Sequence, residues 1–212
     1  MRNLMIFGFF LLFSLISFAQ TNDKTLDEGY QRHKGFFLSM SLGPNFASIT
    51  DVSDGYFDYK YAGTGAQFDL KIGGAIKENL ILHATLTSNT LTGPKITSSG
   101  STDKATNKLT IGEGMIGAGV TYYIMPSNIF LSSSLGIGNF TLVDTSNETD
   151  ISTERGFSMQ LKVGKEWWVS KNWGLGVALT YGKTNLTNKP GYGVEEKMNS
   201  NNIGILFNAT LN

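Results

Sequence analysis

The sequence predicts an all-β fold, an eight-stranded antiparallel up-and-down β-barrel whose strands cross a membrane. Three observations predict this fold: apolar and polar residues alternate with a period of two, the connections are alternately short and long, and no second apolar run reaches the length of a membrane helix. The chain has 212 residues, enough for one domain of ordinary size.

The first 19 residues have the pattern of a secretory signal peptide. Arg2 supplies a positive charge, residues 4–16 are almost wholly apolar, and residues 17–19 read Ser-Phe-Ala, a small-x-small cleavage site. The alternative is a membrane anchor, which needs about 20 apolar residues and a charged flank. The apolar run is shorter than this, so we expect residues 1–19 to direct export and to be removed.

The rest of the chain divides into a polar segment and a barrel domain. We expect residues 20–34 to form a mobile periplasmic lead-in and residues 35–212 to form the outer-membrane barrel. Eight strands are predicted, at residues 36–48, 65–74, 79–91, 110–124, 128–142, 156–168, 172–186 and 201–211. Each is long enough for the roughly 9–11 residues that a tilted membrane strand needs.

The connections between these strands alternate in length. Three are short, and each ends in an asparagine that leads into an apolar residue: Asn79, Asn128 and Asn172. The other four are long and polar, near residues 50–60, 92–108, 143–155 and 187–200. Bacterial barrels have short periplasmic turns and long extracellular loops. The order therefore predicts that both ends of the barrel domain lie in the periplasm.

The two faces of each predicted strand differ in composition. One face is apolar, as at Leu70 and Leu175, and the other is small or polar, as at Ser134. An eight-stranded barrel is only wide enough inside for side chains, and a lysine at mid-bilayer costs about 2–4 kcal/mol. We therefore expect the apolar face to meet lipid. Lysine at position 70 or 175 should then block assembly, whereas Ser134→Lys in the lumen should be milder.

Aromatic residues near the strand ends predict two interfacial belts. The belt beside the short turns would comprise Trp167, Trp168, Trp173, Tyr122, Tyr123 and Phe130. The belt toward the long loops would comprise Tyr59, Tyr61, Phe140, Phe157 and Tyr181.

The lumen face also carries charged and titratable side chains, and we expect these to form one polar network. They are Asp69, Lys71, His83, Glu113, Lys162 and Glu166. The network could be a plug of paired charges or the lining of a narrow pore for small ions. Eight strands leave little free bore, which favours the plug.

In these features the chain resembles the small outer-membrane β-barrel family of the OmpA/OmpX type. The resemblance covers about residues 35–212 and rests on the signal peptide, the eight alternating segments, the turn and loop order and the amphipathic last strand at residues 202–211. It implies a place in the outer membrane of a Gram-negative bacterium. It also implies two partners, outer-membrane lipid and the outer-membrane assembly machinery.

The residues that could suggest catalysis or cofactor binding fit these roles poorly. Residues 112–117 match G-x-G-x-x-G, but they lie inside a strand pattern with no following helix. His83 lies in a His-Ala-Thr sequence of lumen parity, where a deacylase of this membrane would need a serine on the lipid face. Asp51, Asp54 and Asp58 do not have the spacing of a calcium loop. We expect no enzyme activity, no cofactor and no metal.

The overall composition excludes other classes. The chain has no cysteine, so it has neither disulfides nor thiolate metal ligands. Its 17 basic and 17 acidic residues give no basic excess that would suggest nucleic acid. The leading hypothesis is a structural or surface-interaction barrel whose long loops meet a partner outside the cell. The alternatives are a narrow pore and a secreted, lipocalin-like soluble barrel that binds an apolar ligand.

Overall fold

The computed structural model describes residues 31–53, 58–145, 149–191 and 194–212. The predicted signal peptide and residues 20–30 of the predicted lead-in lie outside the described residues. Arg32–Asn212 form one compact unit. No helix in the described ranges is long and apolar enough to cross a membrane.

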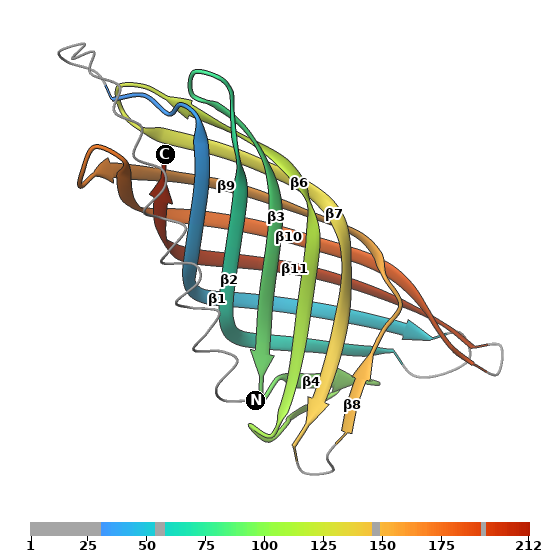
Figure 1. Ribbon diagram of the computed structural model, residues 1–212. Coiled ribbons are helices and arrows are strands. Elements are labelled where there is room, and N and C mark those ends of the chain that lie inside the picture. Colours follow the sequence, from blue (N-terminus) through green and yellow to red (C-terminus); the bar gives the residue numbers. More distant parts are fainter. Residues whose placement is uncertain (1–30, 54–57, 146–148, 192–193) are drawn as a thin grey trace, which may run out of the picture. The chain divides into compact units, whose positions relative to one another are not determined.

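The described chain forms a closed antiparallel barrel, as predicted (Figure 1). Eight long strands form the barrel wall, and we call them the staves. They are β1 (Phe36–Ser53), β2 (Tyr59–Lys77), β3 (Leu80–Thr92), β6 (Leu109–Ile124), β7 (Ile129–Asp144), β9 (Gly156–Trp168), β10 (Trp173–Gly191) and β11 (Val194–Leu211). Neighbouring staves pair in chain order. The barrel closes because β1 pairs with both β2 and β11 along nearly its whole length.

Every predicted strand is present, but several are longer than the sequence suggested. The ends of β1 and β2 pair as far as Asp51 with Tyr59, and those of β10 and β11 pair as far as Gly191 with Val194. Residues 50–53, 59–60, 187–191 and 194–200 are therefore strand, and the prediction of long loops was wrong for these residues. Pairing satisfies the backbone hydrogen bonds of these polar segments, whose Asn, Ser and Thr content suggested loops.

Short strands also lie in the other two long connections. β4 (Lys95–Ser98) and β5 (Ser101–Lys104) form a hairpin, and β4 continues the sheet beyond β3 by pairing with β2. β8 (Thr149–Ser152) pairs with the end of β7. The long-loop end of the barrel is thus built mainly from paired strands.

The backbone geometry explains the asparagines that end two of the predicted short turns. Asn79 and Asn128 have φ angles of 63° and 53°. Asparagine tolerates this left-handed backbone better than most residues.

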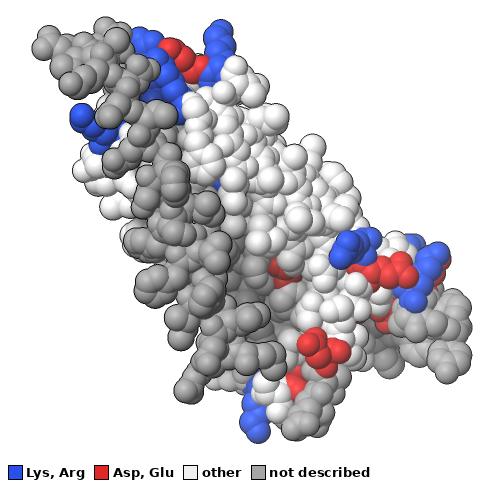
Figure 2. Space-filling view, viewed as in Figure 1, with Lys and Arg blue, Asp and Glu red and all other residues white. Residues whose placement is uncertain are grey.

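The outer wall is apolar between two charged ends. Figure 2 shows Lys, Arg, Asp and Glu gathered at the two ends of the face in view, with uncharged surface between them. Along β10, Leu175, Val177 and Leu179 are exposed by 44–50%, whereas Gly176 and Ala178 between them are buried. The apolar face therefore points outward, as predicted. Leu38 and Leu211, which pair across the β1–β11 seam, are exceptions and are buried.

The interior contains apolar layers that the sequence analysis missed. One cluster fills the long-loop end and comprises Ala47, Ile49, Leu91, Ile111, Phe140, Leu186 and Met198. The other fills the short-turn end and comprises Phe37, Ile81, Tyr123, Phe130 and Ala178. The assignment of Tyr123, Phe130 and Phe140 to interfacial belts was wrong, because their rings are at most 3% exposed and point into the barrel. Side chains alternate between lumen and lipid up to the strand ends, so a position near an end does not by itself place an aromatic ring at the membrane interface.

Candidate functional site

The candidate site is the polar middle of the lumen, between the two apolar clusters. All six residues that the sequence predicted for it are buried, with exposed fractions of 0–6%. The strands position them through the alternation of side chains, which turns every second residue inward. In the structure these six residues belong to three separate hydrogen-bonded groups, which we call the ion-pair group, the His83 group and the Glu113 group.

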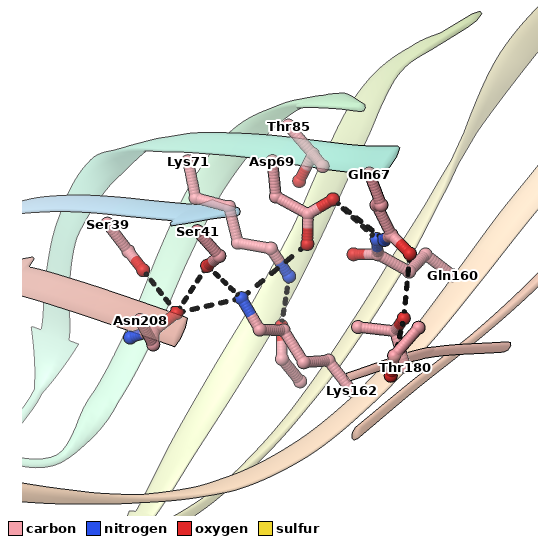
Figure 3. Close-up of polar contacts among 12 residues, drawn as sticks. Ser39, Ser41, Gln67, Asp69, Lys71, Thr85, Gln160, Lys162, Thr180 and Asn208 are labelled. Carbon is pink, nitrogen blue, oxygen red and sulfur yellow. Dashed lines mark hydrogen bonds and ion pairs between the residues drawn. The ribbon is translucent and has the colours of Figure 1, made fainter. Parts of the chain in front are cut away.

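The ion-pair group is centred on Asp69 and Lys162, which approach each other from β2 and β9 (Figure 3). The Lys162 Nζ atom lies 3.5 Å from Asp69 Oδ2. Gln67 and Gln160 donate amide hydrogen bonds of 2.9 and 3.0 Å to Asp69 Oδ1. Lys162 also donates to Ser41 and, over 2.8 Å, to Asn208. A buried ion pair of this kind is stabilised only when surrounding groups satisfy it. Here side chains satisfy Asp69 Oδ1 and Lys162 Nζ, while Asp69 Oδ2 has the ion pair alone.

Glu166 belongs to the same group through Asn208. The Asn208 side-chain amide donates to Glu166 Oε1, which also accepts a 2.6 Å hydrogen bond from Thr210 and a 3.4 Å hydrogen bond from Tyr123. Glu166 thus links the polar middle to the apolar cluster at the short turns, where Tyr123 packs.

The His83 group is a chain of hydroxyls that ends on Lys71. Lys71 donates to Ser132 over 2.7 Å, and Ser132 accepts from Thr121 over 2.8 Å. The His83 ring nitrogens lie 2.9 Å from Thr121 Oγ1 and 3.0 Å from Thr85 Oγ1. Both nitrogens of His83 therefore have partners within the lumen.

The Glu113 group lies nearer the long-loop end. Glu113 accepts hydrogen bonds of 2.6 Å from Ser200 and 3.1 Å from Asn202. Within the part of the chain that the structure describes, it forms no ion pair.

His33 is a further interior residue, which the sequence analysis placed in the mobile lead-in. Its ring is fully buried, stacks on Tyr123 at 3.4 Å between centroids, and lies 4.8 Å from the Trp168 ring. The His33 Nε2 atom is 2.8 Å from Asn128 Oδ1. The barrel unit therefore begins before residue 35, at Arg32.

The backbone also secures His33 to a turn. The amide of Asn79 donates to the His33 carbonyl over 3.0 Å, and the His33 amide donates to the Asn79 side chain over 3.1 Å. We call this arrangement, in which the His33 ring packs on Tyr123 and the His33 backbone bonds to Asn79, the His33 seat. The sequence feature that pointed to it was the recurrence of asparagine at the end of the short turns.

Charges at the rim of the short-turn end hold the same segment. Glu78 pairs with Arg32 at 2.6 Å and with Lys34 at 3.0 Å. Hydrogen bonds from Lys34 and Arg32 hold the pKa of the exposed Glu78 carboxyl below its usual range. Burial lowers the pKa of His33, and its hydrogen bond to Asn128 Oδ1 only partly offsets this effect. Burial therefore favours the neutral imidazole of His33 over its charged form.

This chain resembles known proteins in its fold. No protein-family model and no curated protein matches it. Among solved structures, Neisserial surface protein A superposes with a TM-score of 0.53 at 14% identity, covering 84% of this chain and 96% of that one. The outer membrane protein OprG from Pseudomonas aeruginosa gives a TM-score of 0.52 at 15% identity, covering 86% and 99%.

The chain has the fold of the small outer-membrane β-barrels. At these identities the likeness extends to the fold alone, which agrees with the architecture expected from the sequence.

Proposed function

We propose that this chain is an anchored outer-membrane barrel that presents a stiff, strand-built surface to partners outside the cell, and that its lumen does not conduct. The observation that carries the proposal is the filling of the lumen. Two apolar clusters enclose a polar middle whose charged groups are bonded to one another and to neighbouring side chains.

The outer wall supports placement in a membrane. Exposed aliphatic side chains cover the middle of the staves, and exposing so much apolar surface to water would be unfavourable. Tyr122 and Trp167 are exposed beside the short turns, where Lys165 lies 5.5 Å from the Trp167 ring centre. Phe157 and Tyr181 are exposed toward the other end. Aromatic and basic side chains in these positions suit a membrane interface.

The outer membrane is the membrane that this architecture favours. Closed antiparallel barrels of this size are the fold of outer-membrane proteins such as OprG. By this proposal the short turns and Arg32–Lys34 face the periplasm, and β4, β5 and β8 lie outside the cell.

The paired strands at the long-loop end support a role in surface interaction. β10 and β11 remain paired as far as Gly191 and Val194, so the described residues of this hairpin are paired strands with one register shift. A preorganised surface loses less conformational entropy when it binds a partner.

The alternatives fit the geometry less well. A pore needs a continuous bore, whereas the cavity beside Glu113 measures about 10 Å³, close to the minimum for one water molecule. A lipocalin-like barrel needs its apolar face inside, whereas Leu175, Ile205 and Phe207 point outward and are 48–74% exposed.

We also propose that the barrel catalyses no reaction. His83 is 2% exposed and both of its ring nitrogens lie within hydrogen-bonding distance of threonine hydroxyls in the lumen. No group of three or more His, Cys, Asp or Glu in the described ranges is arranged to hold a metal ion.

Planar-bilayer recording of the purified chain without its first 19 residues tests the proposal. We expect no conductance steps from preparations whose heat-modifiable gel migration shows folded barrels. Regular steps of uniform size would support the pore instead. A protein that stays soluble without detergent would contradict the membrane anchor.

A further inference from the structure

A small cavity in the lumen is lined mostly by oxygen-bearing side chains. It lies beside Glu113 and measures about 10 Å³. The oxygen-bearing residues that line it are Thr87, Asn89, Glu113, Ser158, Gln160 and Asn202. Glu113 is two residues from Ile111, so the cavity lies next to the apolar cluster at the long-loop end.

Two buried carbonyl oxygens at this cavity have no hydrogen-bond donor among the described residues. They are Asn89 Oδ1 and Gln160 Oε1, on side chains that are 6% and 3% exposed. The orientation of Gln160 is fixed because its amide nitrogen donates to the Asp69 carboxylate, which can only accept. Its oxygen is therefore left without a donor, and this normally costs about 1–3 kcal/mol.

The Glu113 carboxylate can accept further hydrogen bonds. Ser200 bonds one of its carboxylate oxygens and Asn202 bonds the other. A carboxylate offers about four lone-pair sites, so roughly two remain.

The charge of the buried lumen is also unbalanced. Counted by formal charge with histidine neutral, the buried side chains of the described lumen are the cations Lys71 and Lys162 and the carboxylates Asp69, Glu113 and Glu166, which sum to 2 − 3 = −1. Lys162 pairs with Asp69, and Lys71 bonds to Ser132. Lys183 also borders the cavity, but its neighbours Gly182 and Thr184 point inward, so the side chain of Lys183 lies on the outer face. A buried charge without a counter-charge is unfavourable.

We propose that this cavity binds one small monovalent cation of the sodium class, coordinated by Glu113, Asn89 Oδ1 and Gln160 Oε1. Carboxylate and amide oxygens are the ligands that hard cations prefer. A single carboxylate matches a single positive charge, whereas calcium takes 6–8 oxygens that usually include several carboxylates. The bound ion neutralises the lumen and completes the plug from the extracellular side. This inference goes beyond the anchoring role and was not expected from the sequence, which predicted no metal.

Thermal unfolding of the refolded barrel in detergent tests the cation site. Sodium chloride should raise the unfolding temperature by a few degrees relative to choline chloride at the same ionic strength, since a cation that binds only the folded state stabilises it. Glu113→Gln should abolish the difference. Glu166→Gln removes another buried carboxylate outside the cavity and should keep it.

Two further measurements apply if Glu113→Gln does not fold. Asn89→Asp adds a second carboxylate and should make the unfolding temperature respond to calcium. Crystals of the unmodified chain soaked in a thallium(I) salt should show an anomalous peak between Glu113 and Gln160. Equal unfolding temperatures of the unmodified chain in sodium and choline salts, a difference that survives Glu113→Gln, or thallium crystals with no peak in the cavity would each overturn the proposal.

Discussion

The ion pair between Lys162 and Asp69 shows how single residues seal this barrel. Both side chains are almost fully buried, so each needs the other's charge in place of water. Lys162→Met should lower the free energy of unfolding by about 3–5 kcal/mol, because it leaves Asp69 buried without a counter-charge. Urea titration of the folded barrel measures this loss. Lys171→Met, at an exposed turn residue, is the control and should change little. An equally small effect of both substitutions would show that the pair does not stabilise the fold.

Ser134 corrects an expectation from the sequence. Lysine seemed tolerable there because the position faces the lumen and not lipid. In the structure Ser134 is fully buried, bonds to Thr85 at 2.9 Å, and lies against Gly119. We now expect Ser134→Lys to prevent folding about as completely as Leu175→Lys, with Ser134→Ala folding normally. Heat-modifiable migration of the three variants checks this, and a folded Ser134→Lys barrel would indicate a roomier lumen.

At the scale of the elements, the staves were predictable and the lumen packing was not. The period of two placed every stave, because one face had to be uniformly apolar, as Leu175, Val177 and Leu179 are on β10. Which side chains meet across the lumen depends on register and shear, so three groups appeared where one network was expected. The register also determines where neighbouring backbones leave no room for a side chain. Gly117 pairs with Gly136, and a Cβ atom on either would lie 2.1–2.2 Å from a carbonyl oxygen of the other strand.

The role of the lead-in residues around His33 is visible only in the folded structure. No pattern in the sequence around His33 indicates burial, because its partners Tyr123, Asn128 and Asn79 come from distant parts of the chain. The two turns bring these partners together at the short-turn end of the barrel, where the His33 ring packs.

This seat should respond to pH. The folded state lowers the pKa of His33 from an ordinary value of 6.5, so the released segment binds a proton more readily than the seated one. The seat is therefore stable above about pH 6.5 and weakens as the pH falls below that value. Limited proteolysis at the N-terminal side of the barrel should become faster between neutral and mildly acidic pH. His33→Phe should remove this dependence, and unchanged cleavage of the unmodified chain would contradict it.

At the scale of the whole molecule, the barrel wall is a boundary between lipid and a packed interior. An exposed apolar band lies outside, and apolar clusters and bonded charges lie inside. The sequence predicted the first part from parity alone. The second part was not predictable from parity, because most apolar residues of the two interior clusters occur near strand ends, where parity and interfacial position compete as explanations.

A spin-label scan along β10 tests whether the apolar face of the wall meets lipid, and the lack of native cysteine makes the scan practical. Single cysteines would be placed at each position from Trp173 to Tyr181, labelled and examined by electron paramagnetic resonance in lipid vesicles. We expect labels at 175, 177 and 179 to be accessible to oxygen dissolved in the bilayer, and labels at 174, 176 and 178 to be immobilised or to prevent folding. Accessibility of 175, 177 and 179 to a water-soluble nickel complex, without alternation, would contradict this expectation.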